Sequence, residues 1–128
     1  MKNIKDFEAF FTVERGWSGA FEEAVAALER EQGGTILVPP GIYETYSIEL
    51  KSNMTLYLEA GAEIRFLQNW QGYRVVHSEF EGKKEALTMP CIYAHDAENV
   101  TLCGHGTLNG QGDYWWENRK DIPQGRPF

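Results

Sequence analysis

The spacing of apolar residues changes once along the chain, from helical to strand-like. Residues 18–32 have apolar side chains every three or four positions, at Phe21, Ala24, Val25 and Leu28. This spacing predicts an amphipathic helix with one face buried. Ser18 or Gly19 is expected to cap the start of the helix, and the glycine pair at 33–34 is expected to end it.

After this helix come short runs rich in Ile, Val, Leu, Thr and Tyr, most of them bounded by Gly, Asn, Asp or Pro. The runs read TILV, IYETYSIEL, MTLYLEA, AEIRF, CIYAH, NVTLC and GTLNG. Each run predicts a short β-strand. Since no second helical pattern lies between them, we expect an all-β protein that begins with one helix.

The strand pattern repeats along the sequence. NMTL at 53–56 matches NVTL at 99–102, and each is followed by a glycine and another short strand. Repeated short strands with turn glycines indicate a solenoid. We therefore predict a right-handed parallel β-helix with coils at about 35–66 and 91–110, in which the 18–32 helix is the N-terminal cap.

Glycine and asparagine are expected at the corners of the coils, because corners require left-handed backbone. Gly106, Gly110 and Gly112 are predicted to be such corners. Asn109 is expected to share that conformation or to bond the next coil. The polar and aromatic stretch 67–90 interrupts the coil pattern. We expect it to leave the solenoid wall, either as a loop that lines a groove or as a surface flap.

Composition and net charge argue against some classes of binding partner. The net charge is −7, which argues against a nucleic-acid surface, and no apolar run is long enough to span a membrane. The N-terminus lacks the apolar run of a leader, so a cytoplasmic location is expected. Cys91 and Cys103 lie in strand-like runs and are interpreted as buried free thiols rather than a bridge. His77, His95 and His105 follow no metal-ligand spacing, so neither metal nor cofactor is expected.

Two stretches of the chain resemble the opening coils of glycoside hydrolase family 28, the polygalacturonase family. They read GGTILVPPGIYETYSIELKSNMTLYLEAGAEIRF and PCIYAHDAENVTLCGHGTLNGQGDYWW. The resemblance covers about 18–128 and is closest to bacterial, exo-acting members. It implies that 1–128 is the N-terminal part of a single β-helix domain, with only the first coils present. The intact enzyme would hydrolyse galacturonide linkages in pectin or its oligomers, with inversion.

The same resemblance assigns catalysis to later coils, which carry Asn-Thr-Asp, Asp-Asp, Gly-His-Gly and Arg-Ile-Lys motifs in that family. Of these, the chain contains only Gly-His-Gly, at 104–106. Because it directly precedes a stretch that is an ordinary corner in the family, His105 is not expected to be catalytic. Asn109 also stands where aspartate is usual. We therefore expect no catalytic residue in this chain, and an isolated chain that is inactive.

The residues by themselves support binding better than catalysis. Inverting hydrolysis needs two carboxyl groups roughly 6.5–9.5 Å apart, one of them protonated near neutral pH. The acids near predicted corners have no partner that the sequence supports, and we interpret them as solvated turn residues: Glu59, Glu63, Asp96, Glu98, Asp113 and Glu117. Tyr114, Trp115 and Trp116 are the candidate substrate-binding residues, because aromatic rings stack on sugar faces. Packing against the solenoid is the alternative interpretation of these rings.

Two other interpretations of the sequence stay open. One is a non-catalytic β-solenoid that binds carbohydrate or a partner protein. The other is a β-helix like pectate lyase, which would need a calcium-binding acidic cluster that the sequence does not contain. If the chain ends at Phe128, its last coil exposes unpaired strand edges. We then expect a two-fold dimer through that end, or a second chain that completes the fold.

Overall fold

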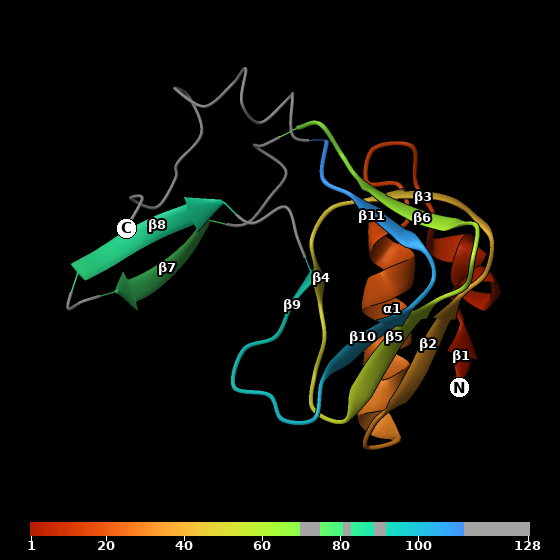
Figure 1. Cartoon of the computed structure of the whole chain (residues 1–128), viewed down its shortest axis with the longest axis horizontal. Helices are drawn as coiled ribbons and strands as arrows, with labels where there is room; N and C mark the ends of the chain where they lie inside the picture. The colour runs from red at the N-terminus through yellow and green to blue at the C-terminus, as the bar shows by residue number, and fades with distance from the viewer. Residues whose placement is uncertain (70–74, 81–82, 89–91, 112–128) are drawn as a thin grey trace.

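The computed structural model describes residues 1–69, 75–80, 83–88 and 92–111 (Figure 1). The elements follow in the order β1 (Lys2–Asn3), the 3₁₀ helix η1 (Ile4–Phe10), α1 (Ser18–Arg30), β2 (Gly34–Val38), β3 (Gly41–Thr45), β4 (Ile48–Glu49), β5 (Met54–Leu58), β6 (Ala62–Phe66), β7 (Val75–Phe80), β8 (Lys83–Thr88), β9 (Ile92–Tyr93), β10 (Thr101–Gly104) and β11 (Thr107–Asn109). No helix in these ranges is long and apolar enough to cross a membrane.

The strands form stacked coils. One sheet has the order β1-β2-β5-β10, a second has the order β11-β6-β3, and a third pairs β4 with β9. All the pairings within these three sheets are parallel. The chain passes from sheet to sheet at each corner and returns one layer further on. The predicted right-handed parallel β-helix is therefore confirmed.

The two copies of the sequence repeat form strands that pair with each other in neighbouring layers. Thr55 pairs with Thr101 and Leu56 pairs with Leu102, as the matching NMTL and NVTL segments indicated. Alternate strand residues point to opposite faces, so one side of each strand fills the solenoid and the other meets solvent. Leu56 and Ile36, its partner in β2, are both fully buried in the core.

The segment 67–91 enlarges one corner of the second coil. In the first coil, residues 46–47 alone join β3 to β4, whereas the equivalent corner between β6 and β9 contains the whole of this segment. It holds an antiparallel hairpin, β7–β8, in which Val75 pairs with Thr88. The hairpin lies beside the stacked coils in Figure 1. The sequence predicted that this stretch leaves the solenoid wall, as a loop or a surface flap, and did not predict the hairpin.

Helix α1 packs on the first coil. Its buried residues share one face: Ser18, Ala20, Phe21, Ala24, Val25 and Leu28. The predicted capping role of Ser18 is wrong, because the N-cap residue is Trp17 and no side chain caps the helix. The Ser18 hydroxyl instead shares a 3.1 Å hydrogen bond with the Thr45 hydroxyl and accepts the Tyr46 amide at 2.8 Å. These bonds tie the start of the helix to the end of β3.

The residues before α1 protect the free edges of the first coil, and the sequence pattern missed them. Lys2 of β1 pairs with Ile36 of β2, so a strand precedes the helix and the expectation that the helix comes first is wrong. On the other sheet, the Trp17 amide donates to the Glu44 carbonyl of β3 at 2.7 Å. An unpaired edge invites pairing with another chain, and both contacts reduce that exposure.

The corners use other residues than expected. Gly104 has the left-handed φ of 108°, whereas Gly106 and Gly110 do not have a positive φ; Gly112 lies outside the described residues. A Cβ on Gly104 would lie 2.0 Å from the Leu58 carbonyl oxygen, so this corner is closed to larger residues. Gly106 is required for space instead, since its Cβ would lie 2.6 Å from that of Leu58.

The interpretation of Cys103 as a buried thiol is also wrong, because Cys103 is free and exposed. It pairs with Tyr57, which is an exposed position of β5, and therefore lies on the outer face of its sheet. Its neighbour Leu102 takes the inward position. Cys91 lies outside the described residues.

Candidate functional site

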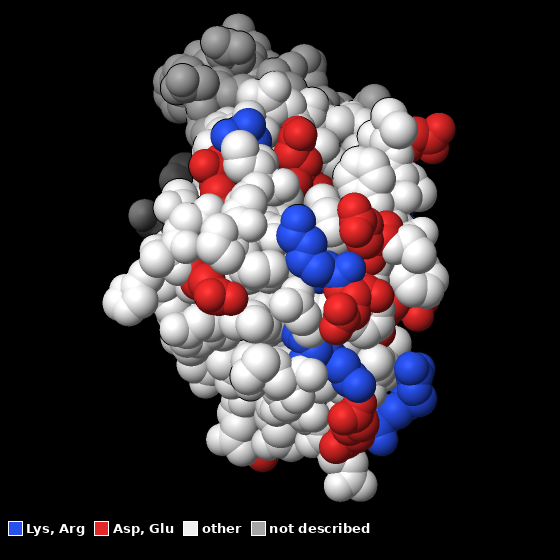
Figure 2. Space-filling model, turned by 90° about the vertical axis from the view of Figure 1, so that its right-hand side faces the viewer, with Lys and Arg blue, Asp and Glu red and all other residues white. Residues whose placement is uncertain are grey.

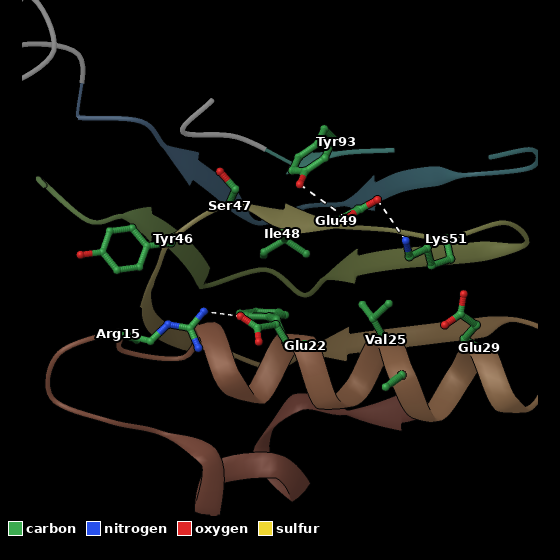
Figure 3. Close-up of a pocket in the computed structure, with 12 residues that line it drawn as sticks. Arg15, Glu22, Val25, Glu29, Tyr46, Ser47, Ile48, Glu49, Lys51 and Tyr93 are labelled. Carbon is green, nitrogen blue, oxygen red and sulfur yellow. Dashed lines mark hydrogen bonds and ion pairs between the residues drawn. The ribbon is translucent and has the colours of Figure 1, made fainter. Parts of the chain in front are cut away.

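A pocket of about 510 Å³ lies between α1 and β4, with β9 beyond it (Figure 3). Three segments line it: the loop before the helix, one side of α1, and the strands β4 and β9 with their flanks. The lining residues are Arg15, Phe21, Glu22, Val25, Ala26, Glu29, Tyr46, Ser47, Ile48, Glu49, Lys51 and Tyr93. Its volume falls in the range of small-molecule sites, roughly 300–1,000 Å³.

The helix supplies a polar wall next to its buried face. Glu22, Ala26 and Glu29 follow one another at helical spacing and line the pocket as one stripe. Val25, on the neighbouring buried stripe, forms part of the floor. Arg15 reaches Glu22 from the loop before the helix and forms an ion pair with it. These contacts place two acids and one cation on the helix side.

The strands supply the opposite wall. Ile48 is buried and continues the apolar floor. The Lys51 ammonium lies 3.0 Å from the Glu49 carboxylate, and the Tyr93 hydroxyl donates to the other oxygen of Glu49 at 3.5 Å. Glu49 and Tyr93 are paired residues of β4 and β9, so adjacent layers build this wall. The Tyr46 hydroxyl accepts the Asn69 side-chain amide at 3.1 Å at one end of the pocket.

Among the described residues that line it, the pocket has more acidic than basic side chains. Its acids are Glu22, Glu29 and Glu49, and its cations are Arg15 and Lys51. Both cations already have a carboxylate partner inside the pocket. Carboxylates only accept hydrogen bonds, so such a pocket suits a ligand that brings donors. Among the described residues, no group of three or more His, Cys, Asp or Glu side chains could hold a metal ion.

Glu31 and Glu63, two carboxyl groups outside the pocket lining, have a displaced pKa. The pKa of Glu63 is lowered by the hydrogen bond from the Asn109 side chain and then by Arg65. The pKa of Glu31 is lowered by its hydrogen bond and charge interaction with Lys2. A general acid needs a raised pKa, which burial or a like charge provides. Because the pKa is lowered in both Glu31 and Glu63, neither group is suited to be the general acid.

The other acids singled out from the sequence lie in corners. Asp96 has a φ of 50° and its carboxylate lies 3.1 Å from His95, with both side chains exposed. The Glu98 backbone amide donates to the Ser52 hydroxyl at 3.0 Å in the turn before β10. Glu59 follows β5, and its backbone amide donates to the Val38 carbonyl at 3.0 Å. None of these acids lines the pocket, although Asp96 lines a second cavity that shares Glu29 and Lys51 with it.

His105 also lies in a corner. Its side chain is exposed, and its backbone amide donates to the Leu58 carbonyl at 2.9 Å. Asn109 has both a cross-layer and a local role, since its amide donates to Glu63 at 3.3 Å and its oxygen accepts the Gln111 amide. The remaining candidates lie outside the described residues: Asp113, Tyr114, Trp115, Trp116 and Glu117.

Sequence reasoning missed the residues that line the pocket. The spacing of Glu22 and Glu29 on one side of the predicted helix was available as a signal, as was the alternation of Glu49 and Lys51. Neither signal identifies the facing wall. Tyr93 reaches Glu49 only because β9 stacks on β4 after the whole of 67–91, and that proximity needs the register.

The fold and the site together define a right-handed parallel β-helix that is capped by one helix and has an acidic pocket at its capped end. No protein-family model matches the chain. It is 31% identical over 107 residues to a Vitis vinifera protein named "Probable polygalacturonase", a match that covers 77% of this chain and 22% of that protein.

Solved structures agree with this match. A hyperthermoactive exopolygalacturonase from Thermotoga maritima is 33% identical with a TM-score of 0.76, over 98% of this chain and 29% of that one. A family 28 exopolygalacturonase from Yersinia enterocolitica, at 24% identity and a TM-score of 0.69, covers 85% of this chain and 20% of its own, and shows the fold alone. The chain therefore spans less than a third of these relatives. It resembles the N-terminal portion of glycoside hydrolase family 28, as the sequence indicated.

Proposed function

We propose that this chain is the N-terminal portion of a glycoside hydrolase that cleaves galacturonide linkages in pectin or its oligomers. The observation that carries the proposal is the 33% identity and TM-score of 0.76 with the Thermotoga exopolygalacturonase over 98% of the chain. The 31% identity to the Vitis protein supports the same activity from sequence.

In this proposal the chain supplies the cap and the first coils, and the chemistry belongs to further coils. An inverting mechanism needs a protonated acid at the leaving oxygen and a base that activates water on the other face. The pKa values of Glu31 and Glu63 are both lowered, which supports a structural role for these two carboxyl groups. We expect the isolated chain to release no reducing sugar from polygalacturonate.

A chimera tests the proposal directly. Residues 1–111 replace the corresponding portion of the Thermotoga maritima exopolygalacturonase. The register that β10 and β11 present to the next layer should be compatible with that enzyme, because the two structures share fold and sequence. The chimera is expected to release galacturonate from polygalacturonate, measured as reducing sugar.

Two controls sharpen this experiment. The Thermotoga enzyme without its N-terminal portion should be inactive, which shows that the grafted coils are required. Circular dichroism and a thermal melt establish that the chimera is folded. A folded chimera without activity would contradict the proposed function.

A non-catalytic carbohydrate- or protein-binding solenoid is the second candidate. The observation that favours it is the pocket between α1 and β4, whose ion pairs and tyrosines suit binding and need no acid catalyst. It predicts that the isolated chain binds a saccharide while the folded chimera stays inactive.

We also propose that β10 and β11 pair with further backbone, supplied by a second copy or by a completing chain. These two strands lie at the ends of their sheets, and Leu102 and Leu108 are 46% and 42% exposed. Unpaired edges with apolar side chains favour such contacts. Light scattering at micromolar concentration should detect a dimer, and a monomer at all concentrations would contradict self-association.

A further inference from the structure

We infer that the pocket between α1 and β4 is a subsite for an uncharged hexopyranose, such as a galacturonate whose carboxyl group is methyl-esterified. The inference rests on the proposed function, in which the ligand is a pectic sugar. It goes beyond that function because it assigns a separate site and a preference for sugars without charge.

The shape of the pocket suits a sugar. Its volume of about 510 Å³ is enough for one or two pyranose rings. Val25 and Ile48 form an apolar floor between the helix and the strand, and the Tyr93 ring lies beyond Glu49 in the next layer (Figure 3). The C–H face of a pyranose packs on apolar and aromatic surface of this kind.

The rim of the pocket suits hydroxyl groups. Glu22, Glu29 and Glu49 present carboxylate oxygens, which act as acceptors for O–H donors in strong, charge-assisted hydrogen bonds. They come from both walls of the pocket, so a bound sugar is expected to donate to acceptors on two sides.

The charge balance disfavours a free uronate. The three carboxylates outnumber Arg15 and Lys51, and each of these cations is already held by an acid of the pocket. A bound uronate would add a fourth carboxylate, and only cations that already neutralise pocket acids would face it. Basic and acidic side chains also lie side by side on the face shown in Figure 2.

The test compares digalacturonate with its dimethyl ester, which lacks both carboxylate charges and carries two additional methyl groups. Each is titrated into this chain at low salt and followed by amide chemical shifts in ¹H–¹⁵N NMR spectra. The ester should shift amides of α1 and of residues 46–51. Its Kd should be about fivefold lower than that of digalacturonate, because the repulsion between two like charges at contact distance costs about 1 kcal/mol in water. High salt should reduce the difference.

Variants locate the effect in the pocket. The double change Glu22→Gln and Glu29→Gln removes two pocket charges and frees Arg15, so digalacturonate should then bind at least as well as the ester. Glu23→Gln removes the same kind of charge from α1 at an exposed position outside the pocket lining, and should leave the preference unchanged. Tyr93→Ala should weaken ester binding about tenfold through the loss of the ring.

Several outcomes would overturn the inference. Digalacturonate could bind the unaltered chain as tightly as the ester, the shifts could map away from α1 and β4, or neither ligand could cause shifts. This result is independent of the chimera assay. Ester binding by this chain together with an inactive chimera would refute the proposed hydrolase and support the subsite. An active chimera without ester binding by this chain would support the hydrolase and refute the subsite.

Discussion

The two ends of the described solenoid carry similar inward-facing residues but bury them to different extents. In one ladder of paired positions, Ile36 and Leu56 are fully buried while Leu102, one layer further, is 46% exposed. In the second sheet, Tyr43 and Ile64 are buried and Leu108 is 42% exposed. The inward-facing side chains follow the same alternation in every layer. They are buried in the core only where another layer covers them. In a solenoid, therefore, stability is a property of neighbouring layers.

The largest expected effect contrasts two positions of one ladder. Leu56→Ala removes a fully buried side chain and leaves a cavity, which should lower the free energy of unfolding by about 3 kcal/mol. Leu102→Ala removes the same atoms from a half-exposed position and should cost less than about 1 kcal/mol. Urea denaturation measures both values. Equal losses would show that the outer layer is as well covered as the middle one.

The second prediction contrasts two serine hydroxyls. Ser18→Ala removes a buried hydroxyl that bonds Thr45 and the Tyr46 amide, and should cost about 1–3 kcal/mol because the buried partners lose their bonds. Ser52→Ala removes the acceptor of the Glu98 amide at an exposed turn, where water replaces it, and should cost about 0.5 kcal/mol. A larger loss at Ser52 in chemical denaturation would mean that the turn before β10, and not the helix start, carries more of the stability.

The third prediction uses the buried tyrosine under the cap. Tyr43 donates to the Pro39 carbonyl at 2.8 Å, and burial, followed by the charge of Glu59, raises the pKa of its phenol. The folded state thus favours the neutral phenol, so this stability is present below about pH 10 and is lost as the pH rises through the folded pKa. Alkaline unfolding should be less steep in Tyr43→Phe, which cannot ionise.

Tyr43→Phe should also lose about 1 kcal/mol at neutral pH, since the Pro39 carbonyl loses its donor. Tyr57→Phe is the matched control, because Tyr57 is an exposed phenol on the outer face of β5. An alkaline unfolding curve that changes equally in both variants would contradict the role of burial at Tyr43.

Local patterns were sufficient to predict much of this fold. The helical spacing at 18–32 predicted α1, and the NMTL and NVTL repeat predicted the stacking of β5 on β10. The alternation within single strands did not show which face of β10 is inward, so Cys103 was misplaced. Ser18 was assigned a capping role because a local window does not show its tertiary partner Thr45.

The pocket was harder to predict, for a physical reason. Its walls are 22–29 and 46–51, together with Tyr93, and these come together only through the register of β4 on β9 and the packing of α1 on the first coil. In the sequence, the segment that forms each wall has the pattern of an ordinary charged surface. A site assembled across layers leaves no compact motif in the sequence.

The smallest expected effect compares the carboxyl group of Glu31, after the capping helix, with that of Glu63, in the middle strand of its sheet. Glu31, held by Lys2 at 2.8 Å, and Glu63, held first by the Asn109 amide and then by Arg65, both have a lowered pKa. A lowered folded pKa gives stability that is present above the unfolded pKa and is lost as the pH falls through the folded one. NMR titration should show that Lys2→Ala returns the pKa of Glu31 towards its ordinary value, and that Asn109→Ala does the same for Glu63.

The response to added salt distinguishes the causes of the lowered pKa in Glu31 and in Glu63. The interaction of Glu31 with Lys2 is a contact between opposite charges at the surface, so added salt should raise the pKa of Glu31. Asn109 is neutral, and its hydrogen bond to Glu63 is screened much less, so the pKa of Glu63 should move by a smaller amount. If the pKa of Glu63 moved more with salt than that of Glu31, Arg65 would be its main partner, and the contact between the β6 and β11 layers would contribute little to its ionisation.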